Sequence, residues 1–498
     1  MSLVILGQPG SAPRDPLPTT SIGQGQLRPL PGPESRNKNF NFGGETNIIP
    51  PMPFTSINPA TGDHLQVYPD HSEAAVEQAL RTAAAAPAGD RAPALRATAR
   101  LLRERRDEFA KLMALEMGKP VSQGCAEAEK CALVCEYYAD QAATFLAPQL
   151  VATEATRSYV LFQPLGTILA VMPWNFPFWQ VFRCAAPALM AGNSMVLKHA
   201  SNVPGCALAI EQLFREAGLP AGAFQTLLIS AARAEALIAH PAIHAVTVTG
   251  STAAGQAIAA KAGACLKKSV LELGGSDPYL VLDDADLPLA AATCTTARVR
   301  NAGQSCIAAK RFFVMESVRP RFEELFVAEM RAQVPGDPLL PATSLGPLAR
   351  ADLRTELHDQ VQRSVRQGAK LLLGGAIPAG PGYFYPPTVL TNVTPEMPVF
   401  AEETFGPVAA IMGVLDEPTA IRLANASVFG LGAAVFTRDA ARGARVAAEL
   451  QAGTCCVNTL VQSDPLLPFG GIKQSGYGRE LAEFGIREFV NIKTVVVK

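Results

Sequence analysis

The sequence has few charged residues and almost no net charge. Only 17% of its 498 residues are Asp, Glu, Lys or Arg, and the formal net charge is −1. Because a nucleic-acid-binding surface needs a basic surplus, no nucleic-acid partner is expected. No apolar run reaches the roughly 18 residues of a transmembrane helix, so no membrane partner is expected either.

Histidine is scarce, and the ten cysteines follow no metal-binding or disulfide pattern. No Cys-x-x-Cys pair occurs, and the six histidines do not cluster near the cysteines. We therefore expect no metal site and no disulfide framework. Free cysteines in this number are typical of the reducing cytoplasm.

The first 53 residues differ from the rest of the chain. They hold ten of the forty prolines and seven of the forty glycines. Such a composition buries little apolar surface, so residues 1–52 are predicted to be a disordered extension. The segment lacks the features of a secretory or mitochondrial address. A wrongly assigned start codon and a regulatory tail are the two explanations left open.

The remaining residues alternate between strand-like and helix-like segments. This order predicts an α/β fold with two doubly wound parallel sheets. The first domain is expected over 53–139 and 163–272, and the second over 273–470. The segments 140–162 and 471–498 look extended, and we expect them to form a small β arm that makes oligomer contacts. Ligands of such sheets bind at the carboxyl ends of the strands.

Two segments of the first domain could bind phosphate. In "TGSTAAG", Gly250 and Gly255 surround a predicted strand-to-helix turn, and a helix N-terminus favours anions. Lys198 follows the end of a neighbouring strand and could bind ribose or phosphate. A turn of small residues is common, however, and a solvated lysine is the simpler interpretation for Lys198.

Three further residues have side chains that could take part in catalysis. Asn175 lies between two prolines in "PWNFP", where its amide could donate to an oxyanion or cap its own turn. Glu272 ends an apolar strand in "LELGG". It could act as a general base or form half of a buried salt bridge. Cys306, in "NAGQSC", has small neighbours that would expose its sulfur, and a cationic cofactor nearby would lower its pKa.

In combination these motifs are specific. From about residue 53 onward the chain resembles the aldehyde dehydrogenase superfamily, through "PWNFP", "TGST", "LELGG", "NAGQSC", "EETFGPV" and "PFGGIKQSGYGRE". Within it, the likeness is greatest to bacterial succinate-semialdehyde dehydrogenases, through "SINPATGD", "LKHASNVPGCA" and "LELGGSDPY". The resemblance implies the two-domain fold of that superfamily, with the first domain binding the dinucleotide and the second carrying the nucleophile.

The resemblance assigns the catalytic roles. Cys306 would attack the aldehyde carbon, and the Asn175 amide and the Cys306 backbone N–H would hold the oxyanion. After hydride transfer, Glu272 would activate the water that hydrolyses the thioester. The other nine cysteines are interpreted as packing residues. Ala308 stands where some relatives have a second cysteine, so their redox switch is expected to be absent.

The resemblance also implies a dinucleotide site and a substrate site. At the cofactor it places Trp174, Lys198, Ser201, Gly250, Ser251, Gly255, Glu403 and Phe405. Strict NAD enzymes often have a glutamate at the position of Ser201. We therefore expect NADP to be accepted as well as NAD. At the substrate carboxylate it places Arg183, Arg300 and Ser463, although either arginine could instead make a structural ion pair.

The predicted activity is oxidation of succinic semialdehyde to succinate, as in γ-aminobutyrate breakdown, by a cytoplasmic homodimer or homotetramer. Another aldehyde, such as glutarate semialdehyde or an aliphatic aldehyde, is the alternative within the enzyme class. A catalytically silent oligomer with a binding or structural role is the alternative outside it. Intact Cys306, Glu272 and Asn175 argue against a silent protein.

Overall fold

The computed structural model describes residues 53–498 of the chain. The predicted disordered extension over 1–52 lies outside the described residues. None of the helices in the described part combines the length and the hydrophobicity that crossing a membrane requires.

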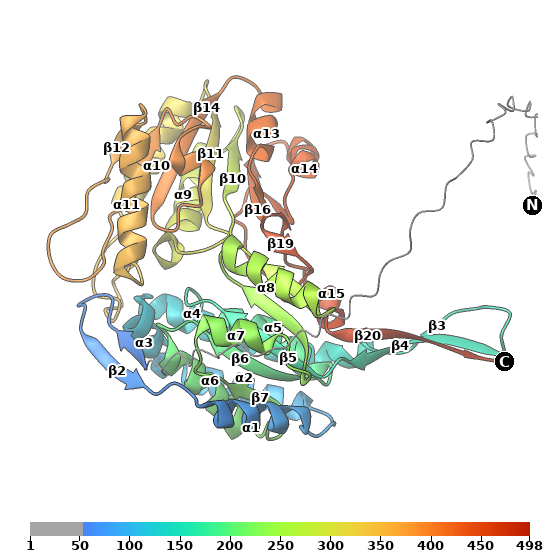
Figure 1. Cartoon of the computed structure of the whole chain (residues 1–498). Coiled ribbons are helices and arrows are strands. Elements are labelled where there is room, and N and C mark those ends of the chain that lie inside the picture. The colour runs from blue at the N-terminus through green and yellow to red at the C-terminus, as the bar shows by residue number, and fades with distance from the viewer. Residues whose placement is uncertain (1–52) are drawn as a thin grey trace, which may run out of the picture. The chain divides into compact units, whose positions relative to one another are not determined.

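The first α/β unit is built on a six-stranded sheet in the order β19-β9-β8-β5-β6-β7 (Figure 1). Its strands are parallel except for β19, which runs antiparallel to β9. The strands are β5 (Thr167–Met172), β6 (Ser194–His199), β7 (Phe224–Thr226), β8 (Ile243–Thr249), β9 (Lys268–Glu272) and β19 (Gly476–Tyr477). The five parallel strands confirm those predicted from the apolar runs, and β5 is almost fully buried, as a strand covered on both faces must be.

Nine helices of the described part belong to this unit. They are α1 (Glu73–Ala84), α2 (Ala92–Glu104), α3 (Arg106–Met117), α4 (Val121–Phe145), α5 (Trp179–Met190), α6 (Pro204–Glu216), α7 (Ala231–Leu237), α8 (Thr252–Ala264) and α15 (Ala482–Arg487). The backbone leaves helical geometry at Arg105, which separates α2 from α3.

The second α/β unit is built on a seven-stranded sheet in the order β12-β13-β14-β11-β10-β16-β17. All its pairings are parallel except β12 with β13. The strands are β10 (Asp277–Val281), β11 (Ala309–Met315), β12 (Lys370–Leu373), β13 (Thr388–Thr391), β14 (Val408–Val414), β16 (Gly432–Phe436) and β17 (Thr454–Val457). The helical elements are α9 (Leu287–Val299), η1 (Arg300–Gly303), α10 (Arg319–Arg331), α11 (Ala351–Arg366), α12 (Pro398–Ala401), α13 (Glu417–Asn425) and α14 (Ala440–Glu449).

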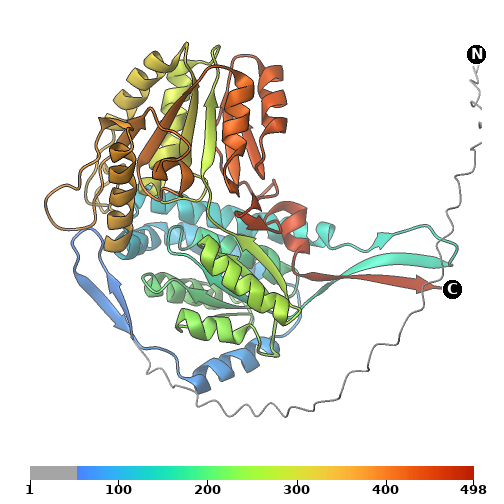
Figure 2. The same cartoon turned by 45° about the horizontal axis from the view of Figure 1, so that its top comes forward.

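A third sheet forms an arm. Its strands are β3 (Gln149–Leu150), β4 (Arg157–Pro164) and β20 (Val490–Val497). β4 and β20 pair antiparallel along eight residues and extend together away from the first sheet in both views (Figures 1 and 2). Two short antiparallel pairs complete the described strands: β1 (Phe54–Ile57) with β2 (His64–Tyr68), and β15 (Phe429–Gly430) with β18 (Ile472–Lys473).

The arm is shorter than the extended segments predicted for it. Residues 140–145 still belong to α4, because its helical pattern continues to Phe145. After residue 471 the chain first returns to the two units through β18, β19 and α15, and only β20 joins the arm. The predicted segments 140–162 and 471–498 were therefore too long at these ends.

The topology brings two sheet edges together. The loop after β5, the turn after β8 and the end of β9 lie at the carboxyl edge of the first sheet. The second sheet contributes the segments that lead into β10, β11 and β14. The predicted catalytic residues Asn175, Glu272 and Cys306 lie on three of these six segments.

Candidate active site

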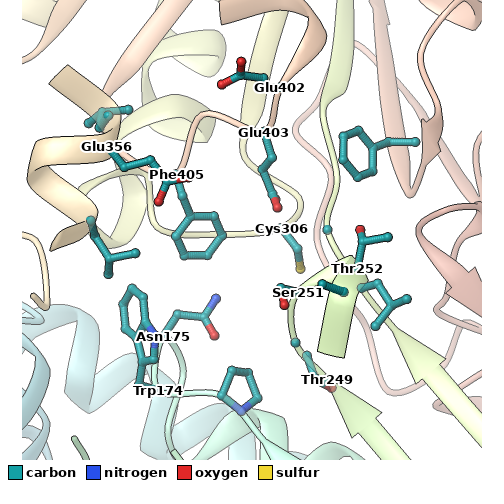
Figure 3. A pocket seen from close by; sticks show the side chains of 18 of the residues that line it. Trp174, Asn175, Thr249, Ser251, Thr252, Cys306, Glu356, Glu402, Glu403 and Phe405 are labelled. Atoms are coloured by element: carbon teal, nitrogen blue, oxygen red, sulfur yellow. The ribbon is translucent and has the colours of Figure 1, made fainter. Parts of the chain in front are cut away.

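Cys306 lies between two cavities. A cavity of about 700 Å³ is lined by the segments that follow β5 and β8 and by those that precede β10 and β14. A second cavity, of about 350 Å³, is lined by α4, α5 and the loop around Ser463. Cys306 lines both. Figure 3 shows its sulfur near the middle of the larger cavity, close to Glu403 and Ser251.

The loop before Cys306 has an unusual backbone. Asn301, Ala302 and Gly303 have φ angles of 55°, 53° and 74°, in the left-handed region. Asparagine and glycine tolerate this region, but alanine adopts it at a cost. The Asn301 amide donates to the carbonyl of Asn175 at 2.7 Å, and Arg298 donates to the Gly303 carbonyl at 2.6 Å. These bonds hold a strained loop and thereby fix where Cys306 points.

Two N–H groups are placed to hold an oxyanion near Cys306. Asn175 is buried, and its amide nitrogen donates to the Gln304 carbonyl at 3.1 Å, which leaves its second hydrogen free. The backbone N–H of Cys306 donates to no atom of residues 53–498. Preorganised donors of this kind stabilise the charge that forms when a carbonyl is attacked.

The protein alone keeps Cys306 as a thiol. Burial raises its pKa to about 12, and the nearby Arg183 and Lys310 offset only part of that effect. This differs from the lowered pKa expected beside a cationic cofactor, because the described residues supply more desolvation than positive charge. Any activation of the thiol must therefore accompany binding of cofactor or substrate.

Glu272 is buried at the end of β9, outside the linings of both cavities. Burial raises its pKa to about 8, against smaller opposite effects of Arg183, Arg479 and the backbone N–H of Gly471. Its closest cation is Arg183, with Oε2 3.9 Å from Nη2. A buried, poorly paired carboxylate is costly to a fold and is more typical of a functional site.

The larger cavity fits a nicotinamide dinucleotide. α8 opens onto it, and the backbone N–H groups of Thr252 and Ala253 have no partner within the helix, as phosphate binding requires. Trp174 and Phe405 pack edge to face at 5.7 Å and form an aromatic wall. Glu403 accepts from Lys310 and from Gly275 N through Oε1, both at 3.0 Å, and Oε2 remains available for hydroxyl groups.

Three predicted cofactor residues lie outside this cavity's lining. A Cβ on Gly255 would lie 2.3 Å from Leu273, so this glycine allows α8 to pack against the end of β9. The structure therefore gives Gly255 a packing role, and its place at the cofactor stays a prediction. Lys198 ends β6 half-buried, and Ser201 is exposed in the turn after it.

The smaller cavity contains the three predicted substrate residues. Ser463 is buried, and Arg300 is exposed at its rim. Arg183 is also in the wall, but its guanidinium pairs with Glu480 and lies near Glu272. Its charge is therefore largely used inside the protein, which supports the structural alternative for this residue.

The family model described as "Aldehyde dehydrogenase family" matches residues 50–495. The chain belongs to the aldehyde dehydrogenase family.

Two curated relatives cover nearly the whole described chain. A Synechocystis protein named a probable NADP(+) succinate-semialdehyde dehydrogenase is 50% identical, over 89% of this chain and 99% of its own. An Escherichia coli succinate semialdehyde dehydrogenase, named with NAD(P)+, is 49% identical, over 90% and 98%. A solved succinic semialdehyde dehydrogenase from Streptococcus pyogenes, in complex with NADP+, is 38% identical, covers 89% of this chain and 99% of its own, and has a TM-score of 0.87.

Three residues of this aldehyde dehydrogenase escaped the sequence analysis. Lys310 is fully buried and donates to the carbonyls of Gly275, Ser305 and Cys306. A lysine inside the apolar run "AAKRFFVM" was the available signal, because such a lysine needs partners. Lys130 lies on α4 and lines the smaller cavity. Nothing in the sequence predicted this, because a single lysine on a long helix is usually exposed to solvent. Phe176 also lines it, whereas the neighbouring Phe178 is buried in the core.

Proposed function

We propose that this aldehyde dehydrogenase oxidises succinic semialdehyde to succinate, with NADP or NAD as electron acceptor. The observation that carries the proposal is the cationic cavity beside Cys306. Arg300 has no carboxylate within 4 Å among residues 53–498, and a serine hydroxyl lies in the same cavity. A free cation favours an aldehyde with a distal carboxylate over a neutral or cationic one. The names of the relatives agree with this substrate.

The reaction begins at Cys306. Its sulfur attacks the aldehyde carbon, the thiol proton passes to solvent, and the carbonyl π pair moves onto the oxygen as the thiohemiacetal anion forms. The amide of Asn175 and the N–H of Cys306 hold the resulting oxyanion. When bound, NADP or NAD would supply the two-electron acceptor that oxidation of this adduct to a thioester requires. Lys310 and the strained loop before Cys306 keep the sulfur in place throughout.

Glu272 is the proposed base for hydrolysis. Its pKa of about 8 means that Glu272 accepts a proton from water only after losing its own, so the active fraction grows as the pH rises toward 8. Because it lies outside both linings, its side chain has to turn toward Cys306 for this step.

Residues 53–139 and 163–272 are proposed to bind the dinucleotide, and 273–470 to carry the nucleophile. Trp174, Gly250, Ser251, Glu403 and Phe405 line the proposed cofactor cavity. Lys198 and Ser201, beyond it, would bind the adenosine half.

The arm is proposed to join subunits of a homodimer or homotetramer. Leu150, Ile492 and Val496 expose 74%, 62% and 56% of their surfaces along it, more than apolar side chains of a free monomer usually show together. A cytoplasmic location and a role in γ-aminobutyrate breakdown follow from the cysteine usage and the resemblance, and are proposals as well.

The direct test compares aldehydes with the purified protein. The formation of reduced cofactor is followed with succinic semialdehyde, glutarate semialdehyde and butanal, each with NADP and with NAD. We expect the highest kcat/KM with succinic semialdehyde and substantial turnover with NADP. A preference for butanal would overturn the substrate proposal and leave the family assignment intact.

A further inference from the structure

Lys130 projects from α4 into the cavity that holds Cys306 on its other side. Its ammonium group donates to the Ser463 hydroxyl at 2.7 Å and lies 4.2 Å from the centre of the Trp179 ring. No carboxylate of residues 53–498 lies within ion-pairing distance of it, so the charge is unbalanced by the protein. A partly buried cation of this kind is a ready binding site for an anion.

The hydroxyl group beside Lys130 has a defined polarity. Ser463 Oγ accepts hydrogen bonds from Lys130 Nζ and from Trp179 Nε1, at 2.7 and 3.1 Å. Both partners are donors only, so the oxygen is used as an acceptor and the serine's own hydrogen remains free. Lys130 and Ser463 together therefore present only donors to a ligand. A carboxylate can accept from both, whereas an alkyl end or a cation cannot.

The charges around this pair also favour an anion. Glu127 is the one acidic side chain that lines the smaller cavity in the described chain. It accepts from the backbone N–H groups of Phe178 and Trp179 and pairs with Lys119, so it does not neutralise Lys130. Arg300, at the rim of the same cavity, adds a second cation without a carboxylate partner.

We propose that Lys130, with the Ser463 hydroxyl, binds the distal carboxylate of the substrate and is a specificity-determining residue of this enzyme. The proposal rests on the proposed function and extends it to a residue on a different helix. It also explains why Lys130 has no carboxylate partner among residues 53–498.

A structural role for Lys130 would have different consequences. Its contact with Trp179 could simply hold that ring in place, and its loss would then affect all aldehydes equally. A carboxylate-binding role affects only substrates that carry a carboxylate. The ratio of kcat/KM for succinic semialdehyde to that for butanal, which has the same carbon count but no carboxylate, separates the two roles.

The first experiment measures that ratio in Lys130→Met, Lys130→Arg and the wild type. Lys111→Met serves as the matched control, because Lys111 is an exposed lysine on α3. We expect Lys130→Met to lower the ratio by about 10- to 100-fold, as loss of a charged hydrogen bond does, and Lys130→Arg to restore part of it. An equal loss with both aldehydes, or an unchanged ratio in Lys130→Met, would overturn the proposal.

The second experiment uses pH and does not depend on a variant's folding. Burial, followed by the charges of Arg183 and Arg300, lowers the pKa of Lys130 to about 8, against small opposite effects of Cys131 and Glu127. Above that pH the free enzyme loses the cation, so the wild-type ratio should fall by up to tenfold per pH unit, while Lys130→Arg holds its ratio. Titration of Cys306 changes kcat/KM for both aldehydes by the same factor, so it does not change their ratio. A flat wild-type ratio from pH about 7 to 9.5 would overturn the proposal.

The two proposals fail in different ways. If the wild type prefers glutarate semialdehyde to succinic semialdehyde, the proposed function fails, and Lys130→Met must still reduce the preference for that aldehyde over pentanal. If the wild type prefers succinic semialdehyde and Lys130→Met keeps that preference, only the Lys130 proposal fails. A wild type that favours no carboxylated aldehyde would overturn both.

Discussion

The two cavities that meet at Cys306 differ in charge and in construction. The larger one is lined by three acidic residues, Glu356, Glu402 and Glu403, and one cation, Arg350, and is built from loops at two sheet edges together with α11. The smaller one is lined by three cations, Lys130, Arg183 and Arg300, which come from two helices and the 3-10 turn after α9.

This difference separates chemistry from specificity. Loops at sheet edges bring the backbone N–H groups, the nucleophile and the aromatic wall together in one place. The cations of the opposite cavity come from helices and a 3-10 turn, so they can change the accepted aldehyde without disturbing the sheet edges. Substitutions that alter one cavity, or the residue that both cavities share, test this separation.

Cys306→Ala removes the group that both cavities share and should have the largest effect. We expect turnover of every aldehyde to fall by at least about 1,000-fold, because no other cysteine of residues 53–498 lines either cavity. NADP binding, measured by calorimetry, should stay within a few-fold of the wild type. Cys265→Ala, a cysteine at the end of α8, is the matched control and should remain active. Residual turnover near the wild-type rate would contradict the role of Cys306.

Glu272→Gln removes the proposed base and should lower kcat by about 100- to 10,000-fold. The base must lose its proton to act, so the wild-type hydrolysis rate should rise with pH and level off above about 8, the pKa of Glu272. The variant should lose this rise. A rapid-quench burst of reduced cofactor should persist, because thioester formation does not need Glu272. Hydrolysis by the variant at the wild-type rate would show that another group activates water.

Arg300→Met removes the rim cation of the smaller cavity only. We expect kcat/KM for succinic semialdehyde to fall by about 10- to 100-fold and kcat/KM for butanal to stay nearly constant. Arg183→Met is expected to affect both aldehydes and the thermal stability, since it leaves Glu480 buried and unpaired. Equal losses on both substrates in Arg300→Met would argue that the rim arginine has no part in specificity.

Ser201→Glu changes the distal end of the cofactor site and should have the smallest effect. A carboxylate there would repel a 2′-phosphate, so kcat/KM for NADP should fall by about tenfold, or ~1.4 kcal/mol, with NAD little affected. Steady-state kinetics with both cofactors would measure this. An unchanged NADP-to-NAD ratio would place the 2′-phosphate elsewhere.

The sequence was most informative where local chemistry dictates local structure. The strands of the first sheet, the turn that opens α8 and the loop of Cys306 are visible because apolar runs end in small or rigid residues. The cysteine's environment was not visible, since its raised pKa comes from burial by segments far apart in the chain.

Other features depended on packing that no local pattern shows. Arg105 separates α2 from α3, although no glycine or proline in the sequence predicts a break there. Gly255 looked like a ligand contact, yet Leu273 from the next strand requires it. Lys130 looked like a surface lysine, because its meeting with Ser463 joins positions 333 residues apart.

The central claim is that one sulfur attacks a carboxylated aldehyde between the two cavities. Mass spectrometry of Glu272→Gln, quenched during turnover of succinic semialdehyde with NADP, tests it most directly. We expect a succinyl group on the peptide that contains Cys306, and the amount of this modified peptide should increase until the burst is complete. Reduced cofactor without any acyl group on Cys306 would contradict it.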